Sequence, residues 1–268
     1  MKYILITGAS SGIGRCLTDY FANSGKYTVL ACDINKEELK LMRSKNIITY
    51  VMDVTSNKSI EEAYNKICKV TNNISVIINN AGINKMTSLI ESDTDIIQSV
   101  MDINLFGMIR VNKIMFPLLN KTSRIINMSS ECGWMSPSPF NGPYIISKYA
   151  LEAYNDTLRR ELRFLGIKVI KIQPGAFKTN MQNNVLDSIK KAKKESILYK
   201  KVFDNLEKSA IKALEEVSNM SYLILAIEDA IESDSPKICY RVKNSRSRKF
   251  MNMFSEKTID SIFYKHLK

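Results

Sequence analysis

A tyrosine and a lysine stand four residues apart in the segment "PYIISKYALEAY", which begins at Pro143. On a helix, residues i and i+4 lie on one face about one turn apart, so Tyr144 and Lys148 would point the same way. An ammonium group beside a phenol favours the phenolate, which gives the pair the chemistry of a general acid/base. A partly exposed helix with an incidental tyrosine and a surface lysine would show the same spacing, so this pair decides nothing alone.

A glycine-rich turn, "TGASSGIG", follows the first apolar segment of the chain. Gly8, Gly12 and Gly14 are spaced Gly-x-x-x-Gly-x-Gly, which departs from the more familiar Gly-x-Gly-x-x-Gly. Glycines let the backbone turn tightly and approach a pyrophosphate, whose charge would lie against the N–H groups of the next helix. The motif predicts a dinucleotide site, with a purely structural turn as the alternative.

Asp33 ends the second apolar segment, in "LACDIN", where a dinucleotide site needs an acid. Its carboxylate would accept hydrogen bonds from the adenosine ribose hydroxyls and would repel a 2′-phosphate. Neither Ser11 nor Ile34 supplies a positive charge that would attract that phosphate. The sequence therefore predicts NAD(H) over NADP(H), and a role for Asp33 only in ending a strand or capping a helix is the alternative.

The composition indicates a globular protein and counts against several other chemistries. Of the 268 residues, 45% are hydrophobic, which suffices for a large core. Five cysteines without a CxxC pair and a single histidine, His266, count against the usual zinc, Ser-His and Cys-His sites, so no metal is expected. The first residues read as a buried strand, and no run approaches the roughly 18 apolar residues of a membrane span, so we expect a cytoplasmic protein.

Nearly continuous apolar segments alternate with helical patterns along most of the chain. This alternation predicts an α/β fold with a single Rossmann-type, doubly wound parallel sheet flanked by helices, in one domain over residues 1–268. Residues 178–235 read as helices that form a substrate lid, and 243–268 as a basic C-terminal helix. The predicted strands are 3–7, 27–32, 47–53, 74–80, 124–129, 167–173 and 237–242.

The net charge of +12 is concentrated toward the end of the chain, where nine Lys or Arg and two acids follow Pro236. A solvated tail explains this charge most simply, and an anionic membrane or a nucleic acid is the alternative partner. The tail lacks the interleaved aromatic residues of single-strand binders, so no nucleic acid is expected. Its last residues have an apolar periodicity that leaves peripheral membrane contact as a weaker alternative.

Seven motifs along the chain resemble those of the short-chain dehydrogenase/reductase family, and they occur in the order that the family shows. The resemblance is dense over residues 2–180 and looser in the tail. The segments "PFNGPYIISKYALEAYNDTLRREL" and "SPKICYRV" also resemble the branch that acts on steroids, retinoids and similar apolar alcohols. The seven motifs are "TGASSGIG" (7–14), "MDVT" (52–55), "NNAG" (79–82), "DINLFG" (102–107), "NMSSECG" (127–133), "YIISK" (144–148) and "PGAFKT" (174–179).

The resemblance implies a role for each matching residue. Tyr144 would be the general acid/base and Lys148 its modulator, while Ser130 holds the substrate oxygen and Asn104 orders a water beside the lysine. Ser130 and Tyr144 would contact the substrate. Trp134 is expected to border it for a different reason, because ligands lie at the carboxyl ends of the strands in this architecture. The implied cofactor contacts are Gly8, Ser10, Ser11, Gly12, Ile13, Gly14, Asp33, Asp53, Val54, Asn80, Ala81, Gly82, Tyr144, Lys148, Pro174, Gly175 and Thr179.

One departure from the family pattern concerns the loop between the serine and the tyrosine. Thirteen residues lie between Ser130 and Tyr144, one more than the resemblance leads us to expect. The Ser-Ser-x-x-Gly match still selects Ser130 over Ser129, which places the extra residue in "WMSPSP". The insertion affects the substrate side of the predicted site.

These motifs predict an NAD(P)(H)-dependent oxidoreductase that interconverts a secondary alcohol and a ketone, with an apolar, steroid-, retinoid- or lipid-like small molecule as substrate. A phenol ionises near pH 10, and Lys148 together with the nicotinamide ring is expected to lower the pKa of Tyr144. The alternatives are a reductase of a small polar or acyl-chain carbonyl, and a non-catalytic dinucleotide-binding sensor.

Two further expectations concern the surroundings of the site. Apolar residues at helical spacing are predicted to line the substrate pocket, and burial in the core is the alternative for them. By resemblance, the helices over 94–119 and 143–165 would pair between subunits in a homodimer or homotetramer. The predicted pocket residues are Met181, Val185, Ile189, Leu198 and Phe203.

Overall fold

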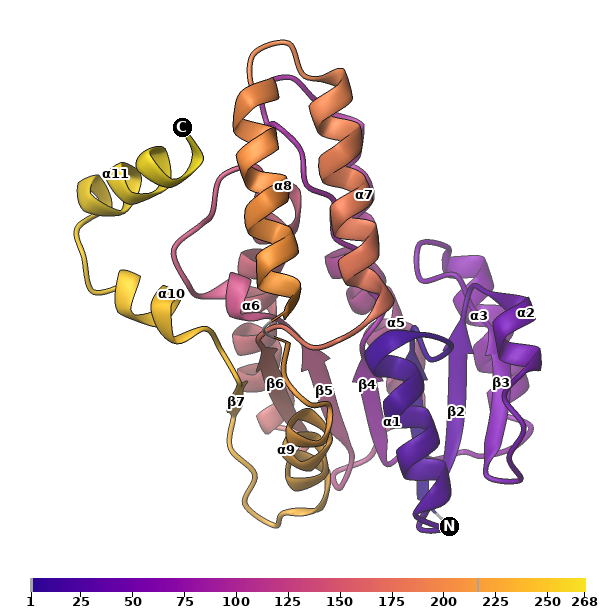
Figure 1. Ribbon diagram of the computed structural model, residues 1–268. Coiled ribbons are helices and arrows are strands. Elements are labelled where there is room, and N and C mark those ends of the chain that lie inside the picture. The colour runs from indigo at the N-terminus through magenta and orange to yellow at the C-terminus, as the bar shows by residue number, and fades with distance from the viewer. Residues whose placement is uncertain (1, 216) are drawn as a thin grey trace.

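Seven parallel strands form one sheet in the order β3-β2-β1-β4-β5-β6-β7 (Figure 1). The computed structural model describes residues 2–215 and 217–268. The strand order reverses between β1 and β4, which is the switch point at which doubly wound sheets bind ligands. The predicted fold class is therefore confirmed. The strands are β1 (Lys2–Thr7), β2 (Tyr27–Asp33), β3 (Ile47–Val51), β4 (Val76–Asn79), β5 (Arg124–Met128), β6 (Lys168–Pro174) and β7 (Cys239–Val242).

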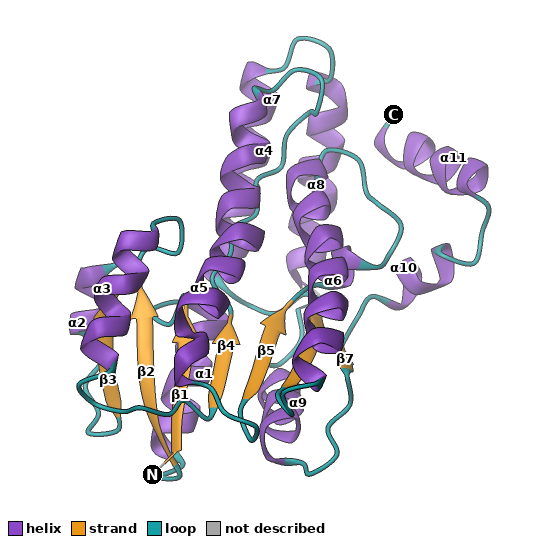
Figure 2. Ribbon diagram, turned by 180° about the vertical axis from the view of Figure 1, so that it is seen from behind, coloured by secondary structure: helices purple, strands orange, loops and turns teal. Residues whose placement is uncertain are grey.

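Helices cover both faces of the sheet because the strands are apolar on both sides. On one face α1 (Gly12–Asn23) and α9 (Ser221–Glu232) pack against β1, β4 and β6. On the other face lie α3 (Asn57–Ile67), α5 (Gly107–Met115) and α6 (Gly142–Arg163) (Figures 1 and 2). The shorter elements are α2 (Lys36–Lys40), α4 (Thr94–Met101), the π-helix η1 (Asp102–Phe106), and the 3₁₀ turns η2 (Phe116–Leu118) and η3 (Glu131–Gly133).

The predicted lid is shorter in the structure than in the sequence analysis. Helices α7 (Asn180–Glu195) and α8 (Lys200–Glu215) form a hairpin that rises beyond the carboxyl ends of the strands (Figure 1). Helix α9 does not belong to it, because Leu223 and Ile227 are fully buried in the core beside the sheet. The boundary 178–235 was therefore wrong for α9, whose apolar residues cover the sheet rather than the site.

The basic C-terminal segment consists of two helices rather than the single predicted helix over 243–268. Helix α10 (Arg246–Met251) ends before Ser255, whose side chain accepts a hydrogen bond from the Thr258 N–H and starts α11 (Glu256–Leu267). An N-cap serine stabilises a new helix start, which explains the break. Helix α11 contacts α8. In the part of the chain that the structure describes, no helix has the length and apolar character needed to span a membrane.

A buried chain of asparagine amides ties α5 and α6 to the centre of the sheet. The Asn79 amide in β4 donates to Asn112 Oδ1 (2.8 Å) and to Asn127 Oδ1 (2.9 Å), and the Asn127 amide donates to Asn155 Oδ1 (3.0 Å). Buried amides are costly without partners, so each fixes the register of the next. The helix that carries Tyr144 and Lys148 is thereby held at a defined height against β5.

Candidate active site

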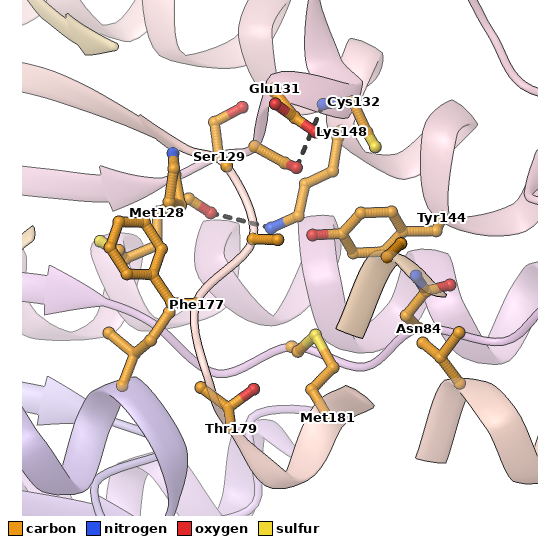
Figure 3. A pocket seen from close by; sticks show the side chains of 18 of the residues that line it. Asn84, Met128, Ser129, Glu131, Cys132, Tyr144, Lys148, Phe177, Thr179 and Met181 are labelled. Atoms are coloured by element: carbon orange, nitrogen blue, oxygen red, sulfur yellow. Dashed lines mark hydrogen bonds between the residues drawn. The ribbon is translucent and has the colours of Figure 1, made fainter. Parts of the chain in front are cut away.

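A cavity of about 290 Å³ opens at the carboxyl ends of the central strands, below the α7–α8 hairpin. Figure 3 shows Tyr144 and Lys148 on one side of it, with Phe177 and Met181 among the side chains facing them. Most of its lining is apolar. The residues that line it are Ile13, Asn80, Gly82, Asn84, Met128, Ser129, Ser130, Glu131, Cys132, Tyr144, Lys148, Pro174, Gly175, Ala176, Phe177, Thr179, Met181, Val185, Leu186, Ala210 and Ala213.

The predicted catalytic side chains meet in this cavity. The Lys148 ammonium lies 5.5 Å from the centroid of the Tyr144 ring and donates a hydrogen bond to the Met128 carbonyl oxygen at 2.8 Å. The hydroxyl of Ser130 accepts a hydrogen bond from the Cys132 N–H at 3.1 Å. Its interaction with the Tyr144 phenol favours the phenolate. In Figure 3 the phenol oxygen of Tyr144 points toward the ammonium of Lys148.

Burial dominates the electrostatics of this pair. Burial raises the pKa of Tyr144, the sulfur of Cys132 and the carboxylate of Glu131 add to the rise, and the bond to Ser130 partly offsets it. Burial also lowers the pKa of Lys148 to about 8, against the opposite effects of Cys132 and Glu152. Burial therefore disfavours the charged form of both groups, and positive charge from a bound ligand would favour the phenolate.

Asn104 lies in the π-helix η1, and its side chain is fully buried. Its Oδ1 accepts from the Ile83 N–H at 2.8 Å, while its Nδ2 donates to the Ile83 carbonyl at 2.9 Å and to Ser147 Oγ at 3.0 Å. A π-helix re-aims a side chain within a helix and is frequent at functional sites. Through Ser147, Asn104 adjoins Lys148, and its predicted role of ordering a water stays a prediction.

The glycine turn has the geometry that a pyrophosphate needs. A Cβ on Gly14 would lie 2.0 Å from the Gly8 carbonyl oxygen, so only glycine permits this close approach. Ser11, the N-cap of α1, makes no side-chain hydrogen bond to the helix, and the first turn carries no acid. The N–H groups and the positive end of α1 therefore remain available to an anion. The residues of this turn fit a dinucleotide.

A second cavity, of about 170 Å³, connects the glycine turn to the catalytic cavity. Ile13, Asn80, Gly82 and Thr179 line both, so the two form one path along the carboxyl edge of the sheet. The residues that line the second cavity are Gly8, Ser11, Gly12, Ile13, Asn80, Ala81, Gly82, Ile83, Asn84, Thr179, Met181 and Asn184.

The acids predicted on the adenosine side are both present at strand ends. Asp33 is buried, and its carboxylate accepts from the Ser10 N–H and the Asn35 N–H, each at 2.9 Å. The Asp53 carboxylate accepts from the N–H and the hydroxyl of Thr55. These bonds fix both carboxylates, and the bond from the Ser10 N–H ties Asp33 to the glycine turn. Val54 is buried against Gly107, which makes it a packing residue in this structure.

The loop predicted on the nicotinamide side begins where β6 ends. A Cβ on Gly175 would lie 2.1 Å from the Lys243 carbonyl oxygen, so the loop and the end of β7 pack backbone to backbone. Pro174, Gly175 and Thr179 all reach the catalytic cavity. Asn80 also holds the site together, since its amide donates to the Thr7 and Gly8 carbonyl oxygens at 3.0 and 3.2 Å.

The predicted substrate contacts divide into two groups. Met181 and Val185 line the catalytic cavity. Ile189 and Phe203 are instead fully buried between α7 and α8, and Leu198 is 66% exposed at the hairpin turn. Apolar residues at helical spacing show that a helix has an apolar face. They do not show whether that face lines the cavity or packs against the neighbouring helix.

The structure does not bring Trp134 into the catalytic cavity. Its ring instead lies 3.9 Å from the guanidinium carbon of Arg241 on β7, a cation–π contact. Phe140, which ends the loop with the extra residue, has a positive φ of 63°. Such a backbone is unusual for a bulky residue, and it turns the chain from "WMSPSP" into α6.

Several residues of the site were missed in the sequence analysis. The Met128 carbonyl and the Ile83 backbone carry no side-chain signal, because backbone groups are common to every residue. Ser147 precedes Lys148 within the "YIISK" motif, so its position was visible. Glu131 and Cys132 follow Ser130 directly, and their proximity to Tyr144 depends on the turn η3.

The fold and the site together define a dinucleotide-dependent oxidoreductase of the Rossmann type. The family model of short chain dehydrogenases matches residues 2–190, and the chain belongs to that family. It is an NAD(P)-dependent oxidoreductase, as the motifs predicted.

Known proteins resemble the chain over most of its length. It is 35% identical to retinol dehydrogenase 7 of Rattus norvegicus, over 89% of this chain and 80% of that protein. It is 30% identical to an NADPH-dependent 3-dehydrocapnine reductase of Ornithobacterium rhinotracheale, over 100% and 98%. A short-chain dehydrogenase from Streptomyces avermitilis superposes with a TM-score of 0.77 over 98% of this chain and 94% of that one, at 21% identity. The predicted resemblance to the retinol dehydrogenase-like branch is confirmed.

The buried ammonium of Lys148 predicts a stability cost. Because its pKa falls from 10.5 to about 8 in the folded protein, the charged form destabilises the fold by about 3 kcal/mol below pH 8. We expect Lys148→Met to raise the free energy of unfolding at pH 7. The gain should shrink as the pH rises from about 8 toward 10.5, since lysine then folds in its neutral form.

Denaturant unfolding at several pH values measures this effect. Lys113→Met on α5, where the lysine is exposed, controls for the loss of one positive charge. Two results would contradict a destabilising charge on Lys148. One is an equal change in the free energy of unfolding for both substitutions at pH 7, and the other is a gain for Lys148→Met that does not change with pH.

Proposed function

We propose that this protein interconverts an apolar secondary alcohol and its ketone, with Tyr144 as the general acid/base. The observation that carries the proposal is the convergence of Ser130, Tyr144 and Lys148 in a largely apolar cavity that continues to the glycine turn. The similarity to a retinol dehydrogenase supports the class of substrate.

In this proposal each polar side chain has one task. A nicotinamide dinucleotide bound along the path from Gly8 to Thr179 would supply the hydride acceptor or donor. In oxidation Tyr144 Oη takes the hydroxyl proton, and in reduction it returns that proton to the carbonyl oxygen. Ser130 donates a hydrogen bond to the substrate oxygen, and Lys148 supplies positive charge beside the phenolate. The apolar wall of Phe177, Met181 and Val185 would exclude water from the reacting atoms.

The burial that raises the pKa of Tyr144 sets the direction of the pH dependence. Oxidation needs the phenolate and should fall as the pH decreases below the pKa of Tyr144 in the loaded enzyme. Reduction needs the phenol and should fall as the pH increases above it. The positive charges of Lys148 and of the oxidised cofactor would bring this pKa down toward the working pH.

A spectroscopic assay of NADH formation tests the proposal with a panel from short polar alcohols to retinoids and steroids. We expect turnover of the bulky apolar alcohols, and a fall in kcat/KM of at least ~10²-fold in Tyr144→Phe. Tyr154→Phe, on the same helix but hydrogen-bonded to Asn112 away from the cavity, serves as the matched control.

Two outcomes of that assay favour the alternatives. Turnover confined to small or acyl-chain carbonyls would replace the apolar substrate and leave the chemistry of Tyr144 in place. Binding of NADH with no turnover in either direction across the panel would favour a dinucleotide-binding sensor.

We propose that NAD(H) is preferred over NADP(H), although one relative is described as NADPH-dependent. The buried carboxylate of Asp33 sits beside the glycine turn, where it would meet the adenosine ribose. Asp33→Asn keeps the size and removes the charge, so the kcat/KM ratio of NADP+ to NAD+ should rise roughly tenfold or more. An unchanged ratio, with Asp19→Asn on the exposed side of α1 as the control, would refute this preference.

The position of the lid residues predicts which of them affect the substrate. Val185 faces the cavity, so Val185→Asn should raise KM for an apolar alcohol by roughly tenfold, the equivalent of about 1.4 kcal/mol of lost burial. Leu198→Asn, at the exposed turn of the same hairpin, should leave KM unchanged. Equal KM values for both variants would mean that α7 does not line the substrate site.

A further inference from the structure

The C-terminal helix α10 lies against the loop that follows Ser130, although 117 residues separate Arg248 from Glu131 in the sequence. The Arg248 guanidinium is 3.3 Å from Glu131 Oε1 and forms an ion pair whose side chains are only 22% and 13% exposed. The other carboxylate oxygen, Glu131 Oε2, accepts the Ser245 N–H at 2.8 Å. Both oxygens of Glu131 are therefore held by the α10 segment.

The same segment makes four further hydrogen bonds to the loop. Arg248 also donates to Cys132 Sγ at 3.3 Å and to the Ser136 carbonyl oxygen at 3.2 Å. Asn252 Oδ1 accepts from both the N–H and the hydroxyl of Ser136, at 2.8 and 2.7 Å. Residues 131–136 are thus fixed along their length by a helix from the end of the chain.

This contact bears on the catalytic cavity, because Glu131 and Cys132 line it beside Ser130 and Tyr144. A carboxylate next to a phenol opposes its ionisation, and a guanidinium on the far side of that carboxylate offsets the effect. The pKa of Tyr144 is raised chiefly by burial, and Cys132 and Glu131 add to the rise. Neutralising Glu131 therefore favours the phenolate.

Among the residues that the structure describes around Tyr144, no other group offsets the negative charge of Glu131. On α6 itself Lys148 is the near charge, and Glu152 beyond it is paired with Lys171 at 2.8 Å. Helix α7 presents the apolar side chains of Met181 and Val185 to the cavity, and the amide of Asn104 in η1 is neutral and bonded to the Ile83 backbone and Ser147. Of the described side chains, Arg248 is the cation that pairs with Glu131.

We propose that Arg248 is a positioning residue of the active site: it pairs with Glu131 and fixes the loop after Ser130, so that Tyr144 can ionise. The inference rests on the proposed function, since it assigns the C-terminal segment to that reaction. It also gives the basic tail a role within the protein, in place of a solvated tail or one that binds a membrane.

The test is the pH dependence of kcat/KM for oxidation in a double-mutant cycle. We expect Arg248→Gln to shift the midpoint of the fall in kcat/KM at low pH by ~0.5–1 unit toward higher pH. Below the midpoint this shift is a roughly three- to tenfold loss of rate. Arg248→Lys should restore most of the rate. Glu131→Gln combined with Arg248→Gln should return the limb toward that of the wild type, because the charge that Arg248 offsets is then gone.

The control is Arg246→Gln, the same change on an exposed arginine of the same helix, which should leave the profile unmoved. Thermal unfolding of every variant measures the structural contribution separately. A uniform loss of rate at all pH values in Arg248→Gln, with no recovery in the double variant, would overturn the proposal and leave Arg248 as a structural anchor.

A second readout does not depend on turnover. With NAD+ bound, the tyrosinate absorbance of the protein minus that of its Tyr144→Phe variant gives the titration of Tyr144 alone. We would measure it with arginine and with glutamine at position 248. An upward shift in the second titration supports the proposal even if no substrate in the panel is turned over, in which case only the proposed function fails. Identical titrations would refute the proposal.

Discussion

The buried ammonium of Lys148 is the constraint on which the site depends. A lysine in a dry cavity is unfavourable, and this one is held by a hydrogen bond to the Met128 carbonyl at the end of β5. Burial lowers its pKa to about 8, so the ammonium persists at neutral pH at a cost in stability, and burial raises the pKa of Tyr144. Burial thus makes the phenolate of Tyr144 costly, and in the proposed reaction the positive charge of a bound cofactor would reduce that cost.

Holding such a pair requires a rigid frame. The amide chain from Asn79 through Asn127 to Asn155 fixes α6 against the sheet, and the π-helix aims Asn104 at Ser147 beside Lys148. On the other side of the switch point, the glycine turn brings α1 close to β4 with no room for a side chain. These contacts place the start of α1 and the start of α6 on one edge of the sheet, the edge at which doubly wound sheets bind their ligands.

Two segments from the last third of the chain complete the cavity in different ways. The α7–α8 hairpin supplies apolar side chains, and its turn projects away from the sheet (Figure 1). The α10 segment supplies charge and hydrogen bonds to the loop after Ser130, through Arg248 and Asn252. In the proposed reaction, the first arrangement would select a substrate by shape and apolar contact, and the second would favour loss of the proton from Tyr144.

The amino-acid sequence is enough to predict the succession of strands and helices along the chain, the glycine turn, and the pairing of Tyr144 with Lys148. These features are local, because a strand, a tight turn or an i, i+4 pair is encoded by residues within a few positions of each other. Three features become visible only in the folded chain: α9 covers the sheet, Trp134 lies against Arg241 outside the cavity, and Arg248 pairs with Glu131. Such contacts join residues far apart in the chain, and an amphipathic pattern specifies that a helix buries one face without specifying what covers it.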